Sequence, residues 1–165
     1  MSKSETGLKF LNGLLQAKQS EEQILDWIYP TSFQAVDVAV FKGRQILLGK
    51  KKKDGELWRF IGGFADPNSE SLEEDAVREV LEEAAISVKN MKYVASCTID
   101  DERYKNSPHS IKSAIFTCDY YAGIPYAQDD IDEVRWFWYF SIGREELVPE
   151  HRKVLDLLKK NTSIH

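Results

Sequence analysis

The chain has 165 residues, of which 42% are hydrophobic, and its formal net charge is −5 at pH 7. This length and apolar content are typical of one domain with a substantial core. The negative charge argues against general nucleic-acid binding, which depends on attraction to phosphates, and no apolar run is long enough to span a membrane. Because the first residues lack the apolar segment of a secretory signal, we expect a cytoplasmic protein.

Two segments near the start of the chain, residues 8–17 and 21–27, have apolar residues at helical spacing. They predict a helical N-terminal extension over residues 1–33, ahead of a second domain at residues 34–165. The apolar residues of the extension must pack either on that domain or on a partner subunit. A homodimer is therefore one of two arrangements that the extension predicts.

Residues 35–41 have the alternating pattern of a strand, and residues 44–49 follow as a partner strand across a Lys42-Gly43 turn. Further strands are expected at residues 91–98, 111–121 and 134–140, and a last helix at residues 150–159. Strands on both sides of a central helix, with another helix near the end, predict an α/β fold with a mixed sheet between helices.

A glycine pair precedes the central helix. Gly62 and Gly63 allow the backbone to approach a ligand closely, and the carbonyl of Gly63 is a candidate metal ligand. Further along, Ser71-Leu-Glu-Glu74 fits a capping box, in which the serine hydroxyl accepts from the backbone of Glu74 and the glutamate reaches back. The helix is therefore expected to begin near Leu72.

The helix carries an unusual concentration of acids. At about 100° per residue, Asp75, Glu79, Glu82 and Glu83 fall within an arc of roughly 100°, and Arg78 lies beside Glu82. Carboxylates three and four residues apart destabilise a helix, so helix formation does not explain them. A solvated face is the ordinary reading of such a pattern, but these acids flank the apolar face and follow two glycines. They predict a site for Mg²⁺ or Mn²⁺ that works on phosphate groups.

The segment resembles the Nudix box, which reads Gly, five variable residues, Glu, seven variable residues, and Arg-Glu-apolar-x-Glu-Glu-x-Gly-apolar. The matching positions are Glu70, Arg78, Glu79, Val80, Glu82, Glu83 and Ile86. Residues 46–51 and 57–64 are similar to the strand and entry loop of Nudix hydrolases that act on ADP-ribose and related nucleotides. The resemblance implies a Nudix-like α/β/α sandwich.

Two positions depart from the pattern. Six residues instead of five separate Gly63 from Glu70, which predicts a bulge that leaves the ligands in place. Ala85 replaces the glycine that normally ends the helix in a left-handed conformation. Alanine there costs about 1 kcal/mol, or the helix ends in another way. Neither change removes a carboxylate.

The resemblance implies that Mg²⁺, or Mn²⁺ in its place, binds Glu79, Glu82 and Glu83 together with the Gly63 carbonyl. Glu79 and Glu83 are its most dependable ligands, and Glu82 is a ligand or the catalytic base. The bound ion would draw in a diphosphate and activate a water molecule. The catalytic carboxylates are thus expected to include Glu82 and Glu83.

The resemblance also implies roles for other residues. Glu70 and Arg78 brace the helix, and Lys50 or Lys51 lies near the phosphates. Trp58 either stacks on the substrate or belongs to the core, and its place at the start of a strand favours the core.

A further catalytic acid is expected from the loop around residues 129–133, with Asp130 as the first candidate and Glu133 as the second. An exposed acidic loop without chemistry is an equal alternative. The predicted function is a Mg²⁺-dependent pyrophosphohydrolase of a nucleoside diphosphate linked to another moiety, with ADP-ribose or a nucleotide sugar as substrate. The alternatives are a nucleoside triphosphate, a dinucleotide such as NADH, or a binding module that hydrolyses nothing.

Overall fold

The computed structural model describes residues 30–162. The helices expected at residues 8–17 and 21–27 lie outside this range. The first described strand begins at Ser32, two positions before the predicted domain boundary at residue 34. No helix in the described range is long and apolar enough to cross a membrane.

A mixed sheet forms the centre of the described domain. Its six strands are β1 (Ser32–Lys42), β2 (Gln45–Lys50), β3 (Ile61–Phe64), β4 (Ser87–Ile99), β5 (Ser110–Ala122) and β6 (Glu133–Trp138). The order is β4-β5-β1-β2-β6, and β3 pairs with the first half of β1. Only the β1–β5 pair is parallel among the pairs of residues 30–162. The prediction of a mixed sheet is confirmed.

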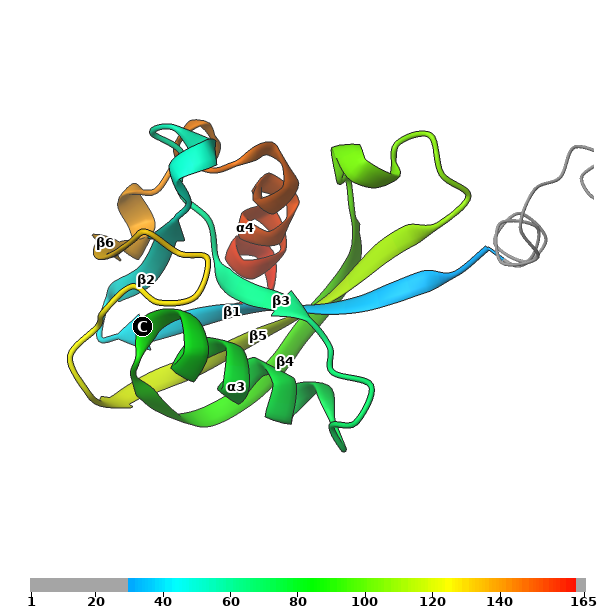
Figure 1. Ribbon diagram of the computed structural model, residues 1–165. Coiled ribbons are helices and arrows are strands. Elements are labelled where there is room, and N and C mark those ends of the chain that lie inside the picture. Colours follow the sequence, from blue (N-terminus) through cyan, green and yellow to red (C-terminus); the bar gives the residue numbers. More distant parts are fainter. Residues whose placement is uncertain (1–29, 163–165) are drawn as a thin grey trace, which may run out of the picture.

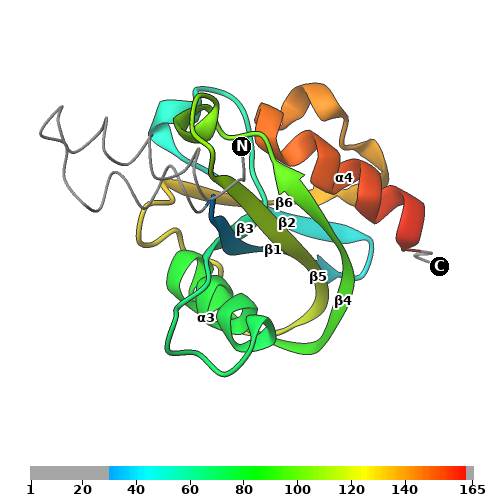
Figure 2. The same ribbon diagram turned by 90° about the vertical axis from the view of Figure 1, so that its right-hand side faces the viewer.

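Two helices cover opposite faces of this sheet, α3 (Leu72–Ala84) and α4 (Pro149–Asn161) (Figures 1 and 2). Each helix packs on its own cluster of buried side chains. The predicted α/β/α sandwich is therefore confirmed. The predicted starts of both helices fall within one residue of the observed ones.

The alternation of side chains along β1 determines what faces each helix. Val36, Val38 and Val40 belong to the cluster on the α3 side, and Ala39 belongs to the cluster on the α4 side. A central strand between two helical layers is buried on both faces, which explains its nearly continuous apolar run. By the same alternation Asp37, the one acid in that run, points to the α4 side.

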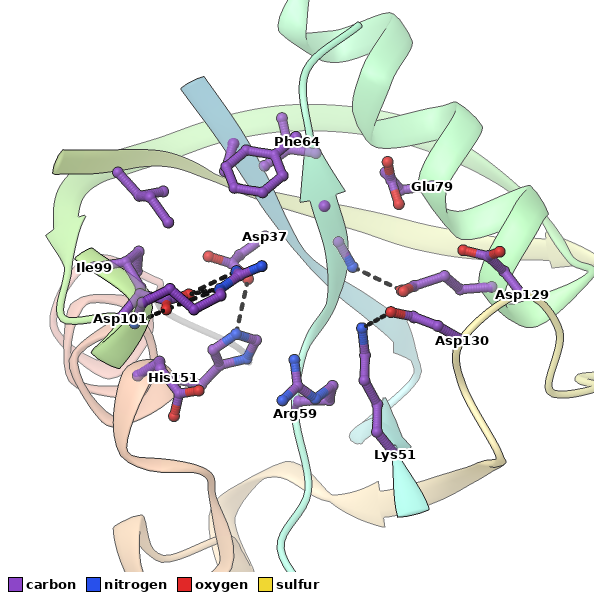
Figure 3. A pocket seen from close by; sticks show the side chains of 18 residues that line it. Asp37, Lys51, Arg59, Phe64, Glu79, Ile99, Asp101, Asp129, Asp130 and His151 are labelled. Atoms are coloured by element: carbon purple, nitrogen blue, oxygen red, sulfur yellow. Dashed lines mark hydrogen bonds and ion pairs between the residues drawn. The ribbon is translucent and has the colours of Figure 1, made fainter. Parts of the chain in front are cut away.

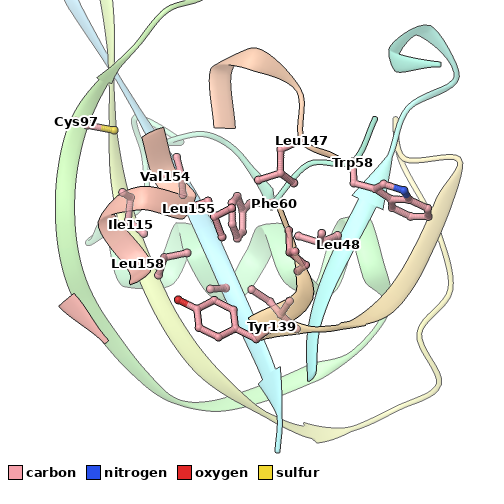
Figure 4. Close-up of a cluster of buried hydrophobic side chains, with 13 residues drawn as sticks. Leu48, Trp58, Phe60, Cys97, Ile115, Tyr139, Leu147, Val154, Leu155 and Leu158 are labelled. Carbon is pink, nitrogen blue, oxygen red and sulfur yellow. The ribbon is translucent and has the colours of Figure 1, made fainter. Parts of the chain in front are cut away.

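The cluster on the α4 side contains most of the large aromatic side chains of the core (Figure 4). Trp58 lies in it with 8% of its surface exposed and packs edge-on against Phe137, with ring centroids 4.7 Å apart. This burial agrees with the core reading of Trp58 and leaves its ring unavailable to a nucleotide. Cys97 and Cys118 are both free and buried.

One strand ends earlier than the sequence predicts. β6 stops at Trp138 instead of residue 140, and Tyr139–Ser141 form a single turn of 3-10 helix. The side chain of Tyr139 is buried in the α4-side cluster, beside Phe41. Packing of this large ring into the core turns the chain away from the sheet edge.

Candidate active site

The start of α3 is capped much as the sequence predicts. The hydroxyl of Ser71 accepts a hydrogen bond from the backbone N–H of Glu74 at 3.2 Å, and the helix begins at Leu72. The Glu74 carboxylate reaches back, but it accepts from the N–H of Glu70 at 3.0 Å, one residue before the cap. The side chain of Glu74 therefore also ties down the end of the preceding loop.

Asp75 holds the long loop between β3 and α3. Its buried carboxylate accepts from the backbone of Asp66 at 2.9 Å and from the hydroxyl of Ser69 at 2.8 Å. Burial opposes ionisation of Asp75, but these hydrogen bonds and the neighbouring Arg78 outweigh it and lower the pKa. Asp75 thus stabilises the loop that contains the extra residue.

The end of α3 decides between the two alternatives for Ala85. This residue adopts the left-handed conformation, with φ 56° and ψ 30°, and its N–H donates to the carbonyl of Leu81 at 3.0 Å. The alanine therefore takes the backbone conformation of the glycine that it replaces. The helix terminus is kept at a cost in conformational energy.

Glu79 lies against the backbone of Gly63. A Cβ atom on that glycine would be 2.7 Å from the nearest carboxylate oxygen of Glu79, so only glycine leaves room for it. Glu79 has 8% of its surface exposed and pairs with Arg78 at 2.8 Å. Burial raises the pKa of Glu79, and Arg78 offsets only part of that effect.

Glu83 sits one helical turn further on and is more deeply buried, with 2% of its surface exposed. Its carboxylate accepts a hydrogen bond from the N–H of Gly62 at 2.9 Å. Burial nevertheless raises the pKa of Glu83 to about 8. The charges of Glu79 and Glu83 are therefore poorly compensated by the protein.

Arg78 organises the exposed side of this helix. It contacts Asp75, Glu79 and Glu82, and it donates to the carbonyl of Phe64 at 3.1 Å. Within residues 30–162 the Glu70 carboxylate is not among its partners. Asp75 occupies the bracing position that the sequence suggested for Glu70.

The acidic loop and the lysine run meet beside α3. The amino group of Lys51 contacts the carboxylate of Asp130, and this contact outweighs burial and lowers the pKa of Asp130. Lys50 instead pairs at 2.8 Å with Glu133, its partner across the β2–β6 ladder. The structure thus brings Lys51 and Asp130 to the helix acids, whereas Lys50 and Glu133 pair with each other on the sheet edge.

A cavity of about 380 Å³ extends along both sides of β3 (Figure 3). On one side, the helix half, it is lined by Lys51, Glu79, Glu83, Asp129 and Asp130. On the other side, the far half, it is lined by Asp37, Ile99, Asp101, Arg103, Ile111 and His151. Gly62 and Gly63 lie between the two halves, with Arg59 at one end and Phe64 at the other.

Comparisons with known proteins identify the family. The model of the NUDIX domain matches residues 31–158. The chain belongs to the Nudix family of hydrolases. The relationship inferred from the box around Glu79 and Glu83 is therefore confirmed.

Two bacterial relatives are NAD-capped RNA hydrolases named NudC. The protein from Pectobacterium atrosepticum is 34% identical over 113 residues, which cover 67% of this chain and 40% of the relative. The protein from Photorhabdus laumondii is 30% identical over 138 residues, which cover 82% of this chain and 49% of the relative. This chain thus spans less than half the length of these curated relatives.

Solved structures show the same fold. An ADP-ribose pyrophosphatase from Streptococcus suis superimposes with a TM-score of 0.60 and 26% identity, over 81% of this chain and 94% of that one. A MutT Nudix hydrolase from Burkholderia pseudomallei gives a TM-score of 0.65 at 19% identity, over 77% and 98% of the two chains. The Nudix domain of the Shewanella oneidensis protein NrtR, in a complex with ADP ribose, gives 0.65 at 17% identity, over 97% and 98%.

The donor set of this Nudix site fits a hard divalent cation. In residues 30–162 no three acidic, histidine or cysteine side chains converge into a ready-made metal cage. Glu79 and Glu83 nevertheless line one wall of the cavity, and burial raises the pKa of both carboxylates. Mg²⁺ commonly takes only one or two carboxylates and completes its shell with water and substrate phosphates. Such an ion would relieve the uncompensated charge.

Several lining residues had no signal in the sequence. Arg59 and Asp129 stood in segments already singled out, but nothing distinguished them from their neighbours. Asp37 and His151 are 114 positions apart and meet only because β1 and α4 pack together, with Nε2 3.4 Å from a carboxylate oxygen. Sequence spacing alone does not reveal such a pair.

Proposed function

We propose that this Nudix chain is a metal-dependent pyrophosphohydrolase that cleaves the phosphoanhydride of a nucleoside diphosphate linked to another moiety, with ADP-ribose as the best candidate. The observation that carries the proposal is the cavity along β3. Its helix half gathers carboxylates and a lysine, which suit a metal ion and phosphates, and its far half places the apolar side chains of Ile99 and Ile111 beside polar groups. A substrate with a central diphosphate and a flat group at one end matches that division.

The residues of the helix half have separable roles. Glu79, Glu83 and the Gly63 carbonyl would hold Mg²⁺ or Mn²⁺, which when bound neutralises phosphate oxygens and lowers the pKa of a water molecule. Lys51 presents a positive charge to the phosphates.

Two other carboxylates are candidates to orient the attacking water and accept its proton. Asp130 is kept ionised beside Lys51 and lines the cavity, so it is assigned to orient the water. Glu82, whose side chain is half exposed and is not among the residues that line this cavity, is the alternative base. Arg78 holds Glu79 and Glu82 in place through direct ion pairs.

The relatives support the substrate class. The Streptococcus suis protein is an ADP-ribose pyrophosphatase, and the NudC proteins act on NAD-capped RNA. ADP-ribose and NAD share an adenosine diphosphate that carries a second group. A dinucleotide is therefore the second candidate substrate, and exclusion of RNA, formation of a homodimer and a cytoplasmic location stay predictions.

The test is a substrate panel with product analysis by mass. Purified protein with Mg²⁺ is incubated with ADP-ribose, NAD⁺, NADH, ADP and nucleoside triphosphates. ADP-ribose should give AMP and ribose 5-phosphate, and ADP should react poorly because it lacks the distal group whose binding positions the anhydride. Release of pyrophosphate from triphosphates at a much higher kcat/KM would overturn the substrate assignment. Tight binding without any cleavage would instead indicate a binding module.

A further inference from the structure

The proposed chemistry leaves one buried acid in the cavity without a role. Asp37 is 5% exposed, yet it lines the far half of the cavity. It lies opposite Gly62 in the β1–β3 pairing and points toward α4. Burial of a carboxylate is costly unless its oxygens are satisfied, so its partners reveal what it is built to do.

Two protein donors hold Asp37. The hydroxyl of Ser113 donates to one carboxylate oxygen at 2.6 Å, and Nε2 of His151 lies 3.4 Å from the other. Nδ1 of this histidine accepts from the N–H of Phe60 at 2.8 Å, so the hydrogen of the neutral ring is on Nε2, facing Asp37. Burial lowers the pKa of His151 and keeps it neutral.

This arrangement leaves acceptor capacity unused. A carboxylate accepts up to about four hydrogen bonds, and within residues 30–162 no lysine or arginine forms an ion pair with Asp37. The two guanidinium groups that line the same cavity are already engaged. Arg59 binds Asp54 through two hydrogen bonds of 2.7 and 3.0 Å, and Arg103 binds Asp101 in the same manner.

The walls around Asp37 favour a flat ring. Ile99 and Ile111 line the far half, and Phe64 stands at the end of β3 with 41% of its surface exposed. The guanidinium carbon of Arg103 lies 5.8 Å from the centroid of the Phe64 ring. Asp101 and Arg103 also line this half but are paired with each other, so Asp37 is the buried acceptor that lies beside the apolar side chains. Apolar surface with a convergent polar group is typical of sites for heterocycles.

We propose that Asp37 is a specificity-determining residue, which accepts a hydrogen bond from the amino group of the substrate's adenine base bound in the far half. Ser113 and His151 are positioning residues that orient its carboxylate. The inference rests on the proposed function for its ADP-linked substrate. A carboxylate that only accepts pairs with an amino group, and an analogue without that donor leaves it unsatisfied.

The experiment compares ADP-ribose with the analogue whose purine lacks the 6-amino group. The wild-type protein should favour ADP-ribose by about tenfold or more in kcat/KM. Asp37→Asn keeps the shape of the side chain and an oxygen that can accept from the Ser113 hydroxyl, and it should reduce that preference. Asp37→Ala should bring the preference close to one. The loss should appear mainly in KM for ADP-ribose, because the base is held equally before and during reaction.

Glu150→Gln is the matched control, since Glu150 is another acid that lines the cavity. It should leave the preference for the amino group unchanged. An equal preference in the wild-type protein, Asp37→Asn and Asp37→Ala would show that Asp37 is structural only and overturn the inference. An equal loss in Glu150→Gln would also overturn it, because general charge would then be responsible.

Failure of this inference can be distinguished from failure of the proposed function. If no ADP-linked compound is hydrolysed, calorimetry still compares the binding of AMP with that of its unsubstituted-purine analogue. Tighter binding of AMP that disappears in Asp37→Asn would support the role of Asp37. Equal binding of the two nucleotides by the wild-type protein would contradict it. Thermal unfolding of each variant verifies that the fold persists.

Discussion

Replacement of Gly63 with alanine should impair catalysis and leave the stability of the fold nearly unchanged. The new Cβ atom would lie 2.7 Å from Glu79 Oε2 and 2.8 Å from the two other carboxylate atoms. Ordinary contact begins at 3.4 Å, so the carboxylate must move by about 0.7 Å. The obstacle is the end of a flexible side chain, and Gly63 has no positive φ, so the backbone tolerates alanine.

A shift of this size at a metal ligand should be costly to the reaction. A displacement near 1 Å can reduce a rate by about 10²-fold, so kcat should fall by roughly 10- to 10²-fold. The free energy of unfolding should change by less than about 1 kcal/mol, or about 2–4 °C in Tm. The assay is ADP-ribose hydrolysis at saturating Mg²⁺, with Tm measured by calorimetry.

Gly62 supplies the matched control. Its φ is +154°, and a Cβ there would lie 2.0 Å from the backbone carbonyl oxygen of Val36. That oxygen belongs to the sheet and cannot move freely, so Gly62→Ala should cost about 3 kcal/mol or more of stability. If Gly63→Ala keeps wild-type kcat, the position of the Glu79 carboxylate is not important for catalysis, and the reasoning is refuted.

Further predictions concern single residues. Glu83→Gln should lower kcat by at least about 10²-fold at saturating Mg²⁺ while the fold persists. Near-normal turnover would contradict the assignment of the metal site. Asp130→Asn should lower kcat far more than it raises KM, whereas Glu133→Gln, on the sheet edge, should behave like wild type; the reverse order would favour Glu133. The pKa of His151 is lowered in the fold, so acid favours the unfolded chain, and stability present above about pH 6.5 is lost as the pH falls below it. Relative to His151→Gln, wild type should lose up to about 1.4 kcal/mol of unfolding free energy per pH unit below about 6.5 in denaturant titrations, and parallel curves would argue against a neutral buried histidine. Ala85→Gly should stabilise the protein by about 1 kcal/mol, since it removes the strain of the left-handed alanine; an unchanged or lower Tm would contradict that account.

The sequence alone determined the local features of the site. The capping residues and the apolar period placed the start of α3 at Leu72, and the box pattern identified the family through Glu79 and Glu83. These signals are readable because each depends on residues within one helix or one turn. The alternation of β1 and the turn at Gly43 were also local and were predicted correctly.

Tertiary packing decided which of the predicted residues share one cavity. Lys51 and Asp130 meet beside Glu83, whereas Lys50 and Glu133 pair on the sheet edge, because the register between β2 and β6 fixes which lysine faces which acid. A shift of one residue along a strand sends a side chain to the opposite face of the sheet, and composition does not encode that register.

The far half of the cavity was even harder to predict from the sequence. Asp37 reads in the sequence as the polar member of a strand, and His151 reads as one position of a terminal helix. Their contact exists because β1 lies between two helical layers and α4 packs on the face to which Asp37 points. Local periodicity determined the elements and the acidic helix, and only the packing of distant segments created the buried carboxylate in the cavity.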